Sequence, residues 1–456
     1  KTKTFIAENN IKIIYLDIND KYENPYLLGL FASYFDIKNE AIHHALKEIF
    51  GRKGEATRNA NIAIFDNVSS KINTLKSDIS IKNVGEKREI SYGNKLIAYG
   101  AINAGLEYYS AYPMTPASTI LTEIIASKKV PYLQAEDEIA VMNSALGASF
   151  TGARSMVGTS GGGFALMTEA LSFAIQAEIP IVAVLSQRAG PSTGTPTFHE
   201  TGDINFALNP TFGDFEHIVL SPSSLEEAYY FAGLALNLAD KYQSIVLLLV
   251  DKQTSEILGT YSNLQKVEID RGIILENPPL DYKRYELNES GISPRVMVGT
   301  QNGDFIATSY EHDEFGATTE DTNMKKLMTE KRWRKLQDFY KKEGFSGFEV
   351  INENAKKMIV TFSTTAYTAK EFIKNNPEYG LVIIKFLKPL DERLLDVLSG
   401  REEIIFVESN YSGQLEKYIC NELGLRSIKG LKISNLRKYD LYPFYIEDFN
   451  ELKFKN

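Results

Sequence analysis

The sequence is poor in cysteine and histidine, the residues that most often hold metals in redox proteins. Its 456 residues include one cysteine, Cys420, and five histidines. One thiol cannot form an intrachain disulfide, and an iron–sulfur cluster usually takes four thiolates. The histidines show no metal-ligand spacing; His43 and His44, for example, are adjacent and point in different directions on a helix. We therefore expect no metal site in this chain, and any redox centre lies elsewhere.

Long apolar runs and an excess of positive charge are also missing. The apolar run Ile245–Val250 is far too short to cross a bilayer, and the first residues, KTKTFIAENN, contain no apolar signal core. A net charge of -9 argues against a broad nucleic-acid surface. We expect a cytoplasmic protein that binds neither nucleic acid nor membrane. Because the chain begins at Lys1 and not at Met, we also expect part of an N-terminal domain to be absent from it.

Buried strands alternate with amphipathic helices in the middle of the chain. Ile181–Leu185 and Ile245–Val250 are continuous apolar runs, which are typical of central parallel strands. In the helix expected from Asp137 to Phe150, apolar residues recur at spacings of three and four and predict one buried face, namely Ile139, Met142, Leu146 and Phe150. The pattern predicts an α/β fold with a doubly wound parallel sheet over about 90–265.

The flanking segments differ in pattern. Residues 1–83 look like the end of an α/β domain, with a strand at Ile11–Asp17, helices at Tyr26–Tyr34 and Ala41–Phe50, and a polar linker at Ser69–Arg88. Residues 266–350 predict a connector with one long helix near Thr322–Lys342. Residues 351–456 predict a second, smaller α/β unit with strands at Met358–Phe362, Leu381–Phe386 and Ile404–Glu408.

Four segments that follow expected strands carry the residues suited to chemistry. In parallel α/β sheets, ligands bind beyond the carboxyl ends of the strands. The segments are the loop Tyr112–Pro116 (YPMTP), the helix start at Glu138 (within QAEDE), the turn Thr159–Gly163 (TSGGG) and the loop Arg188–Thr197 (RAGPSTGTPT). Two prolines fix the first loop, in which Thr115 offers a hydroxyl. Together the four segments are expected to line one pocket.

Glu138 has two interpretations. A carboxylate near a helix N-terminus is favoured by the backbone dipole, so Glu138 is explained as a helix-start acid beside Glu136 and Asp137. The functional interpretation is a buried carboxylate that binds a ring nitrogen of the aminopyrimidine of thiamine diphosphate. Such a carboxylate promotes the imino tautomer, which takes the proton from the thiazolium carbon.

The other segments also leave a structural alternative open. The glycines of TSGGG serve a tight strand-to-helix turn or a close approach to a ligand, and neither the P-loop nor the GxGxxG spacing is present. Arg188 matches a carboxylate through two parallel hydrogen bonds, unless it only extends from a strand end to solvent. The Pro, Gly and Thr content of its loop favours a substrate lid in which Thr197 adds a hydroxyl.

An ordered series of motifs resembles one known family. AYPMTP is similar to the Tyr-Pro-Ile-Thr-Pro loop of the α subunit of 2-oxoacid:ferredoxin oxidoreductases, in the form with a γ-type domain fused upstream. Four further segments resemble the next four sequence blocks of that family, in the same order: QAEDEIAVMNSALGAS, TSGGGFALM, QRAGPSTGTPT and TGDI. The segment NPYLLG is similar to the end of its γ domain. The resemblance covers nearly all of the chain.

The resemblance implies a fold and a reaction. It implies the C-terminal part of a γ-type domain at 1–83, a thiamine diphosphate pyrimidine-binding domain at 90–265, and a transketolase C-terminal-like domain at 351–456. The implied reaction is the CoA-dependent oxidative decarboxylation of a 2-oxoacid, 2-oxoglutarate or pyruvate or both, to acyl-CoA, carbon dioxide and reduced ferredoxin.

The resemblance also implies residue roles. Glu138 is the cofactor-activating carboxylate, and Pro113, through its carbonyl, holds the aminopyrimidine together with loop atoms of Tyr112 and Gly161. Thr115, Arg188 and Thr197 face the 2-oxoacid. The chain departs from the family at Met114 in place of isoleucine, at Gly162 in place of a common proline, and at Phe212 in place of a histidine, so the role of that histidine is not carried over.

Half of the expected cofactor site has no motif in this chain. Thiamine enzymes bind the diphosphate and Mg2+ with Gly-Asp-Gly followed downstream by Asn-Asn, yet Gly202-Asp203, Gly213-Asp214 and Gly303-Asp304 all lack the second glycine. The resemblance implies a β subunit that supplies the diphosphate site, Mg2+ and a [4Fe-4S] cluster. The working site is therefore expected at a subunit interface.

Three alternatives remain. The enzyme could prefer indolepyruvate or branched-chain 2-oxoacids within the same chemistry. A second hypothesis is a non-catalytic assembly module of the same fold. A pocket without catalytic function would need neither the acid Glu138 nor the carboxylate-binding Arg188. A nucleotide-binding Rossmann protein is the third, and the lack of GxGxxG after the first strand argues against it.

Overall fold

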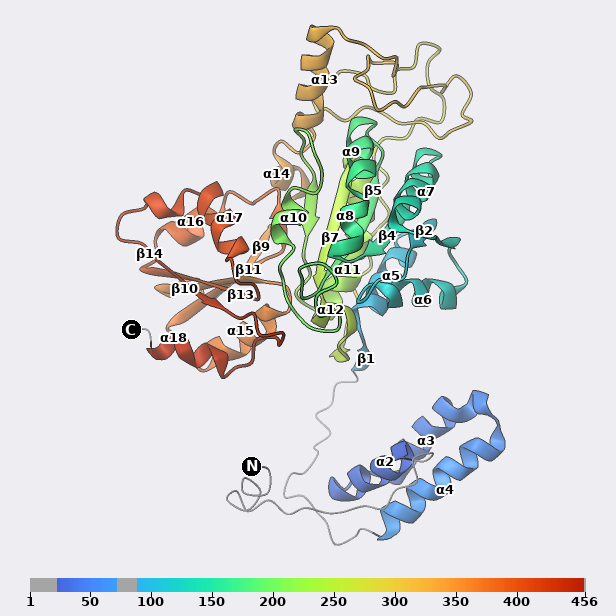
Figure 1. Cartoon of the computed structure of the whole chain (residues 1–456), viewed down its shortest axis with the longest axis vertical. Coiled ribbons are helices and arrows are strands. Elements are labelled where there is room, and N and C mark those ends of the chain that lie inside the picture. The colour runs from blue at the N-terminus through green and yellow to red at the C-terminus, as the bar shows by residue number, and fades with distance from the viewer. Residues whose placement is uncertain (1–22, 72–87, 455–456) are drawn as a thin grey trace. The chain divides into compact units, whose positions relative to one another are not determined.

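The structure, a computed structural model, describes residues 23–71 and 88–454 (Figure 1). The chain divides into two compact units, Lys1–Lys87 and Arg88–Asn456. Within the described residues, no helix has the length and apolar character that a membrane span requires.

The described part of the first unit is helical. It consists of α2 (Glu23–Tyr34), α3 (Asn39–Phe50), a short 3-10 turn and α4 (Glu55–Lys71). These helices enclose a small core of Ala32, Leu46 and Phe65. The two expected helices are present, whereas α4 was not expected and occupies the start of the segment interpreted as a linker from Ser69. Its few apolar residues stand among polar ones, so its periodicity is weak. The strand expected at Ile11–Asp17 lies outside the described residues.

The second unit is built on a seven-stranded sheet with strand order β12-β6-β7-β5-β4-β2-β3. All neighbours pair in parallel except β12 and β6, which are antiparallel. The strands are β2 (Tyr108–Ala111), β3 (Tyr132–Gln134), β4 (Ser155–Thr159), β5 (Ile181–Gln187), β6 (Ile218–Leu220), β7 (Ile245–Asp251) and β12 (Phe386–Lys388). The α/β fold with a parallel sheet is therefore confirmed. A separate antiparallel pair joins β1 (Glu89–Ser91) and β8 (Gly259–Tyr261).

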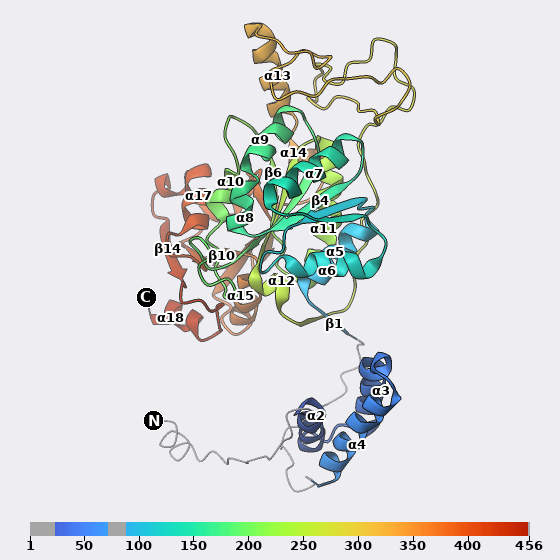
Figure 2. The ribbon, with the colours of Figure 1, turned by 45° about the vertical axis from the view of Figure 1, so that its right-hand side comes forward.

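Helices cover both faces of this sheet, as Figure 2 shows. One face packs against α7 (Glu138–Phe150), α8 (Gly161–Leu166) and α9 (Thr168–Gln176). The opposite face packs against α5 (Gly93–Asn103), α6 (Ser118–Ser127) and α11 (Leu225–Tyr242). Two short helices, α10 (Ile204–Leu208) and α12 (Lys252–Glu256), follow the carboxyl ends of β5 and β7.

A five-stranded sheet with order β14-β13-β10-β11-β9 forms the C-terminal part. Its strands are β9 (Phe348–Ile351), β10 (Lys357–Phe362), β11 (Tyr379–Ile384), β13 (Glu403–Glu408) and β14 (Lys432–Arg437). Its helices are α15 (Thr365–Lys374), α16 (Leu394–Ser399), α17 (Gln414–Glu422) and α18 (Glu451–Phe454). Residues of both sheets, such as Leu247 and Val360, belong to one continuous hydrophobic core.

One expected strand is divided between the two sheets. The apolar run Leu381–Phe386 predicted a single strand, but β11 ends at Ile384 and Phe386 pairs with Leu220 at the edge of the other sheet. Lys385 marks the crossing point, where its ammonium binds Ser223 Oγ and Glu227 Oε1, each at 2.5 Å. An apolar pattern does not tell which sheet accepts a strand.

Two helix predictions were wrong in detail. The buried face of α7 consists of Val141, Met142, Ala145, Leu146 and Ser149, while Ile139 is 51% exposed. The long helix expected in the connector is broken into α13 (Thr322–Arg334) and α14 (Phe339–Glu343), because Asp338 between them has a left-handed φ of 54°. The face of α13 toward the protein carries Met328 and Lys331, whereas Leu327 and Trp333 are exposed.

Candidate functional site

The four segments singled out in the sequence leave the carboxyl ends of neighbouring strands. In the sheet order β5-β4-β2-β3, these strands lead to Arg188, Gly161, Tyr112 and Glu138 respectively. Parallel strands open a crevice at this edge, where ligands of α/β proteins bind. The parallel topology thus places residues up to 85 positions apart in the sequence, Tyr112 and Thr197, in loops at one edge of the sheet.

Glu138 is the first residue of α7. The helix is capped by Asp137, whose carboxylate accepts a hydrogen bond from the backbone N–H of Ala140 at 2.8 Å. Glu138 itself is only 3% exposed, and its Oε1 has no hydrogen-bond partner in the described part of the chain. Burial raises the pKa of this carboxyl, and the charge of Asp137 adds to the effect. Burying a carboxyl oxygen without a hydrogen-bond partner costs free energy, unless a bound ligand supplies the partner.

Gly163 lies directly against this acid. A Cβ at Gly163 would lie 2.2 Å from Glu138 Oε1 and 2.3 Å from Thr159 Oγ1. The TSGGG segment is therefore the end of β4 plus the first turn of α8, and its third glycine makes room for the carboxylate. Gly162, where the family commonly has proline, has open space at its Cβ position.

Arg188 ties two of the loops together. It is 9% exposed, and its Nη1 donates a hydrogen bond to the carbonyl oxygen of Thr115 at 2.6 Å. Burial lowers the pKa of Arg188, and the carboxylate of Asp203 opposes that effect. The contact uses the backbone of Thr115, so the Thr115 hydroxyl is not engaged by Arg188.

Asn94 supports the same loop and was missed by the sequence reasoning. Its Nδ2 donates to the carbonyl of Pro116 at 2.7 Å and to Thr119 Oγ1 at 2.8 Å. The side chain is fully buried at the start of α5. Asn94 stands beside Gly93 and Lys95 at the helix start, so its local sequence does not distinguish it from a solvent-exposed residue.

Tyr112, Pro113 and Thr197 are exposed at the same edge of the sheet. No hydrogen bond joins Thr197 to Arg188 or Thr115 within the described ranges. The loop that carries Thr197 closes on itself, since Thr195 N donates to Ala189 O at 3.1 Å. The smaller sheet then holds the end of this loop, because Thr201 N donates to Ser409 O at 2.7 Å.

Asp203, from the TGDI block, also lies in this region, although the sequence reasoning gave it no role. Its backbone N–H donates to Gln187 Oε1 at 3.1 Å. Its carboxylate oxygens lie 2.9 and 3.0 Å from the position of a Cβ at Gly161. Burial, strengthened by the charge of Glu200, raises the pKa of Asp203 to about 6, against the opposing effect of Arg188.

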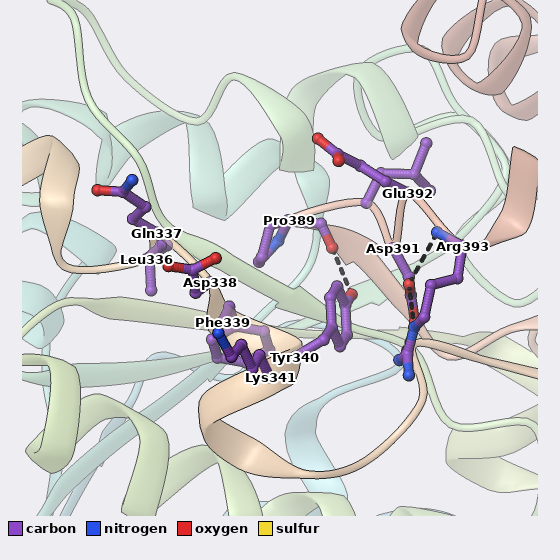
Figure 3. A pocket seen from close by; sticks show the side chains of 11 residues that line it. Leu336, Gln337, Asp338, Phe339, Tyr340, Lys341, Pro389, Asp391, Glu392 and Arg393 are labelled. Atoms are coloured by element: carbon purple, nitrogen blue, oxygen red, sulfur yellow. Dashed lines mark hydrogen bonds and ion pairs between the residues drawn. The ribbon is translucent and has the colours of Figure 1, made fainter.

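A pocket of about 690 Å3 lies elsewhere in the second unit (Figure 3). It is lined by residues 336–341 and 389–393, none of which belongs to the loops above. Tyr340 donates to the carbonyl of Pro389 at 2.5 Å, and Arg393 pairs with Asp391 at 2.6 Å. These polar groups are satisfied by each other, so the carboxyl edge of the large sheet remains the candidate site.

The comparisons with known proteins show which family the chain belongs to. The model of the family described as pyruvate flavodoxin/ferredoxin oxidoreductase, thiamine diphosphate-binding, matches residues 99–331. The chain belongs to this family. The resemblance noted in its motifs is thereby confirmed, and the matched region includes Glu138 and Arg188.

Relatives and a solved structure agree with this assignment. The chain is 36% identical to 2-oxoacid:ferredoxin oxidoreductase 2, subunit alpha, of Aeropyrum pernix, over 73% of this chain and 56% of that protein. It is 32% identical to 2-oxoacid:ferredoxin oxidoreductase 1, subunit alpha, of Sulfurisphaera tokodaii, over 94% of this chain and 69% of that protein. The chain thus spans between about half and two thirds of the length of these relatives.

The solved structure is the 2-oxoglutarate:ferredoxin oxidoreductase of Magnetococcus marinus with 2-oxoglutarate, coenzyme A and succinyl-CoA bound. It superposes with a TM-score of 0.85 at 31% identity, over 95% of this chain and 77% of that one. The match at this identity agrees with the family assignment and with the α/β fold described above.

Proposed function

We propose that this chain acts as the α subunit of a 2-oxoacid:ferredoxin oxidoreductase, which converts a 2-oxoacid and CoA to acyl-CoA and carbon dioxide and reduces ferredoxin. The substrate class is 2-oxoglutarate, pyruvate or both. Support comes from a further relative, the 2-oxoglutarate synthase subunit KorA of Methanocaldococcus jannaschii, which is 32% identical over 70% of this chain and 88% of that protein.

The observation that carries the proposal is the unpartnered Oε1 of Glu138. Thiamine diphosphate, when bound, supplies the carbon nucleophile that attacks the 2-oxo group. Its aminopyrimidine has a ring nitrogen that needs a carboxylic partner. Glu138 fits this need, because it is buried, its pKa is raised and one oxygen lacks a partner. Gly163 keeps that oxygen free of side-chain atoms.

Within this proposal Glu138 holds and returns a proton at Oε1. The raised pKa brings the acid closer to neutral pH, where a group that exchanges protons works best. Tyr112, Pro113 and Gly161 would hold the cofactor beside Glu138, and Pro113 would offer its carbonyl to the aminopyrimidine.

Arg188 is the proposed anchor of the substrate carboxylate. A guanidinium has five N–H donors, and the one hydrogen bond that it makes here leaves donors for a bidentate contact. Thr115 and Thr197 add hydroxyls from the loops on either side, and Thr197 reaches the substrate only if its exposed loop closes.

A second subunit completes the proposed enzyme. It would bring the diphosphate site, Mg2+ and the [4Fe-4S] cluster, because the chain has no Gly-Asp-Gly motif and one cysteine. Strand β3 is exposed along its whole length at the edge of the sheet next to Glu138, and Ile139 beside it is also exposed. An open sheet edge with apolar side chains is a surface suited to a partner.

The test is reconstitution. The chain co-expressed with its partner subunit should reduce ferredoxin or a viologen dye with a 2-oxoacid, CoA and thiamine diphosphate, and a panel of 2-oxoacids gives the preference. The isolated chain should be inactive. Turnover by the isolated chain, or no turnover by the complex with any 2-oxoacid, would contradict the proposal.

A further inference from the structure

Asp203 has no role in the reaction as proposed, yet it lies against the same helical turn as Glu138. The carboxylate of Asp203 abuts Gly161 and that of Glu138 abuts Gly163, both in the first turn of α8. The hydrogen bond from its backbone to Gln187 fixes Asp203 next to the end of β5, directly before Arg188. Two acids therefore border this turn, one on the cofactor side and one on the Arg188 side.

The charges that act on Asp203 come from its own loop and from β5. Glu200 precedes it by three residues, and Arg188 follows β5. Helix α8 approaches the Asp203 carboxylate with the uncharged Gly161, and α17 contributes the neutral amide of Gln414, which donates to Gly202 O at 2.7 Å. Burial and Glu200 outweigh Arg188, so this carboxyl, with a pKa of about 6, changes its charge near neutral pH.

Asp203 is also the acid whose charge acts on Arg188. No ion pair within 4.0 Å joins the two side chains in the described ranges. Asp203 therefore occupies none of the N–H donors of the guanidinium, although its negative charge acts on Arg188. A carboxylate that binds Arg188 therefore adds a second negative charge to a cation on which the charge of Asp203 already acts. Two negative charges near one cation disfavour each other, and protonation of one of them relieves the repulsion.

We propose that Asp203 controls the access of the substrate carboxylate to Arg188, being ionised in the free enzyme and taking up one proton from solvent when the 2-oxoacid binds. The O–H formed on Asp203 converts a repelling acceptor into a hydrogen-bond donor. This inference rests on the proposed function, because it takes the ligand of Arg188 to be a 2-oxoacid. Asp203 acts here as a positioning and gating residue for the substrate.

Calorimetry of substrate binding tests the proposal without turnover. The full-length protein with its partner subunit is loaded with a thiamine diphosphate analogue that cannot react, and is titrated with pyruvate and with 2-oxoglutarate between pH 5.5 and 8.5. Two buffers of different ionisation enthalpy give the number of protons taken up. The wild-type complex should take up close to one proton per 2-oxoacid above pH 6, and Kd should rise by nearly tenfold per pH unit there.

Variants separate Asp203 from other acids. Asp203→Asn should bind with no proton uptake and a flat pH profile, and Asp203→Glu should restore the uptake. Glu200→Gln removes the charge that raises the pKa of Asp203, so the onset of the pH dependence should move to lower pH. The exposed Asp214 provides the matched control, since Asp214→Asn should behave as wild type.

Equal proton uptake by the wild type and Asp203→Asn would overturn the proposal and leave the proposed function intact. If the Asn variant does not assemble, an unchanged onset in Glu200→Gln overturns it instead. No binding of either 2-oxoacid to the wild-type complex at any pH would overturn both.

Discussion

The guanidinium of Arg188 donates to the backbone carbonyl of Thr115 at 2.6 Å, and this contact joins the loop after β5 to the loop after β2. The acceptor is neutral, so the positive charge of Arg188 is oriented but not cancelled. Asn94 also holds the loop that carries Thr115, because its Nδ2 donates a hydrogen bond to the carbonyl oxygen of Pro116. The arrangement keeps a buried cation ready for an anionic ligand at the carboxyl edge of the sheet.

Replacement of Arg188 by alanine should weaken substrate binding selectively. The variant loses the cation that we propose binds the substrate carboxylate, so the KM for the 2-oxoacid should rise by roughly 10- to 100-fold, in line with about 1.5–3 kcal/mol for a charged hydrogen bond. The KM for CoA should change little. Steady-state kinetics of the co-expressed complex measure both values, and an equal rise in both would indicate a structural arginine.

Replacement of Glu138 by glutamine should abolish 2-oxoacid-dependent dye reduction while the subunits still assemble. The amide keeps the size of the side chain but cannot hold or release the proton at Oε1. The neighbouring Glu136 is exposed and gives a matched control, because Glu136→Gln removes the same charge outside the buried position. Size-exclusion chromatography verifies assembly, and near wild-type rates for Glu138→Gln would reject its assigned role.

The position of the candidate site residues in the fold could be predicted from the sequence because it depends on local patterns. A strand followed by a loop and a helix start places Glu138 and Arg188 at the carboxyl edge, and the parallel topology brings the edges together. The same reasoning failed for Ile139, since a helical period gives the spacing of a buried face but not its direction. Ile139 occupies an expected core position and is exposed at the edge where the partner is proposed.

Contacts between distant residues could not be predicted in this way. Asn94 and Asp203 reach their partners through tertiary packing, across 22 residues in the case of Asn94 and Pro116. Lys331 received no role in the sequence analysis, yet it is fully buried, and its ammonium donates a hydrogen bond at 2.8 Å to the carboxylate of Glu178, which lies 153 residues away. From the sequence alone, a charged residue on a helix is expected to be exposed, because its buried partner is not visible in the local pattern.

Gly163 should tolerate no side chain, whereas Gly162 should. A methyl group at Gly163 would lie 2.2 Å from Glu138 Oε1 and must displace the carboxylate, so Gly163→Ala should lower kcat by at least tenfold and reduce the affinity for thiamine diphosphate. Gly162→Ala has open space and should retain activity and cofactor affinity within about twofold. Cofactor titration monitored by activity and by fluorescence compares the two, and equal behaviour would show that the carboxylate does not need the space beside Gly163.

The connector is fastened to the large sheet by a buried cluster of charges. Glu178 accepts Lys331 at 2.8 Å and Lys335 at 2.6 Å, and Arg284 donates to the backbone carbonyl of Glu178 at 2.9 Å. Glu178 thus contacts three buried cations, two through its carboxylate and one through its backbone carbonyl. Burial and the neighbouring cations lower the pKa of Lys335 to about 7, although Glu178 opposes the shift.

Stability should therefore increase with pH in a way that depends on Lys335. The pKa of Lys335 is about 7 in the folded protein, well below the ordinary value of 10.5. Between pH 7 and 10.5 the unfolded chain therefore binds more protons than the folded protein, so the free energy of unfolding increases as the pH rises. The free energy of unfolding should gain up to about 1.4 kcal/mol per pH unit from this group between pH 7 and 10. Urea unfolding followed by circular dichroism at pH 7, 8 and 9 measures the slope, which Lys335→Met should reduce by about that amount. Lys341→Met, at an exposed position on α14, should leave the slope as in the wild type, and an unchanged slope in Lys335→Met would show that Lys335 stays charged across this range.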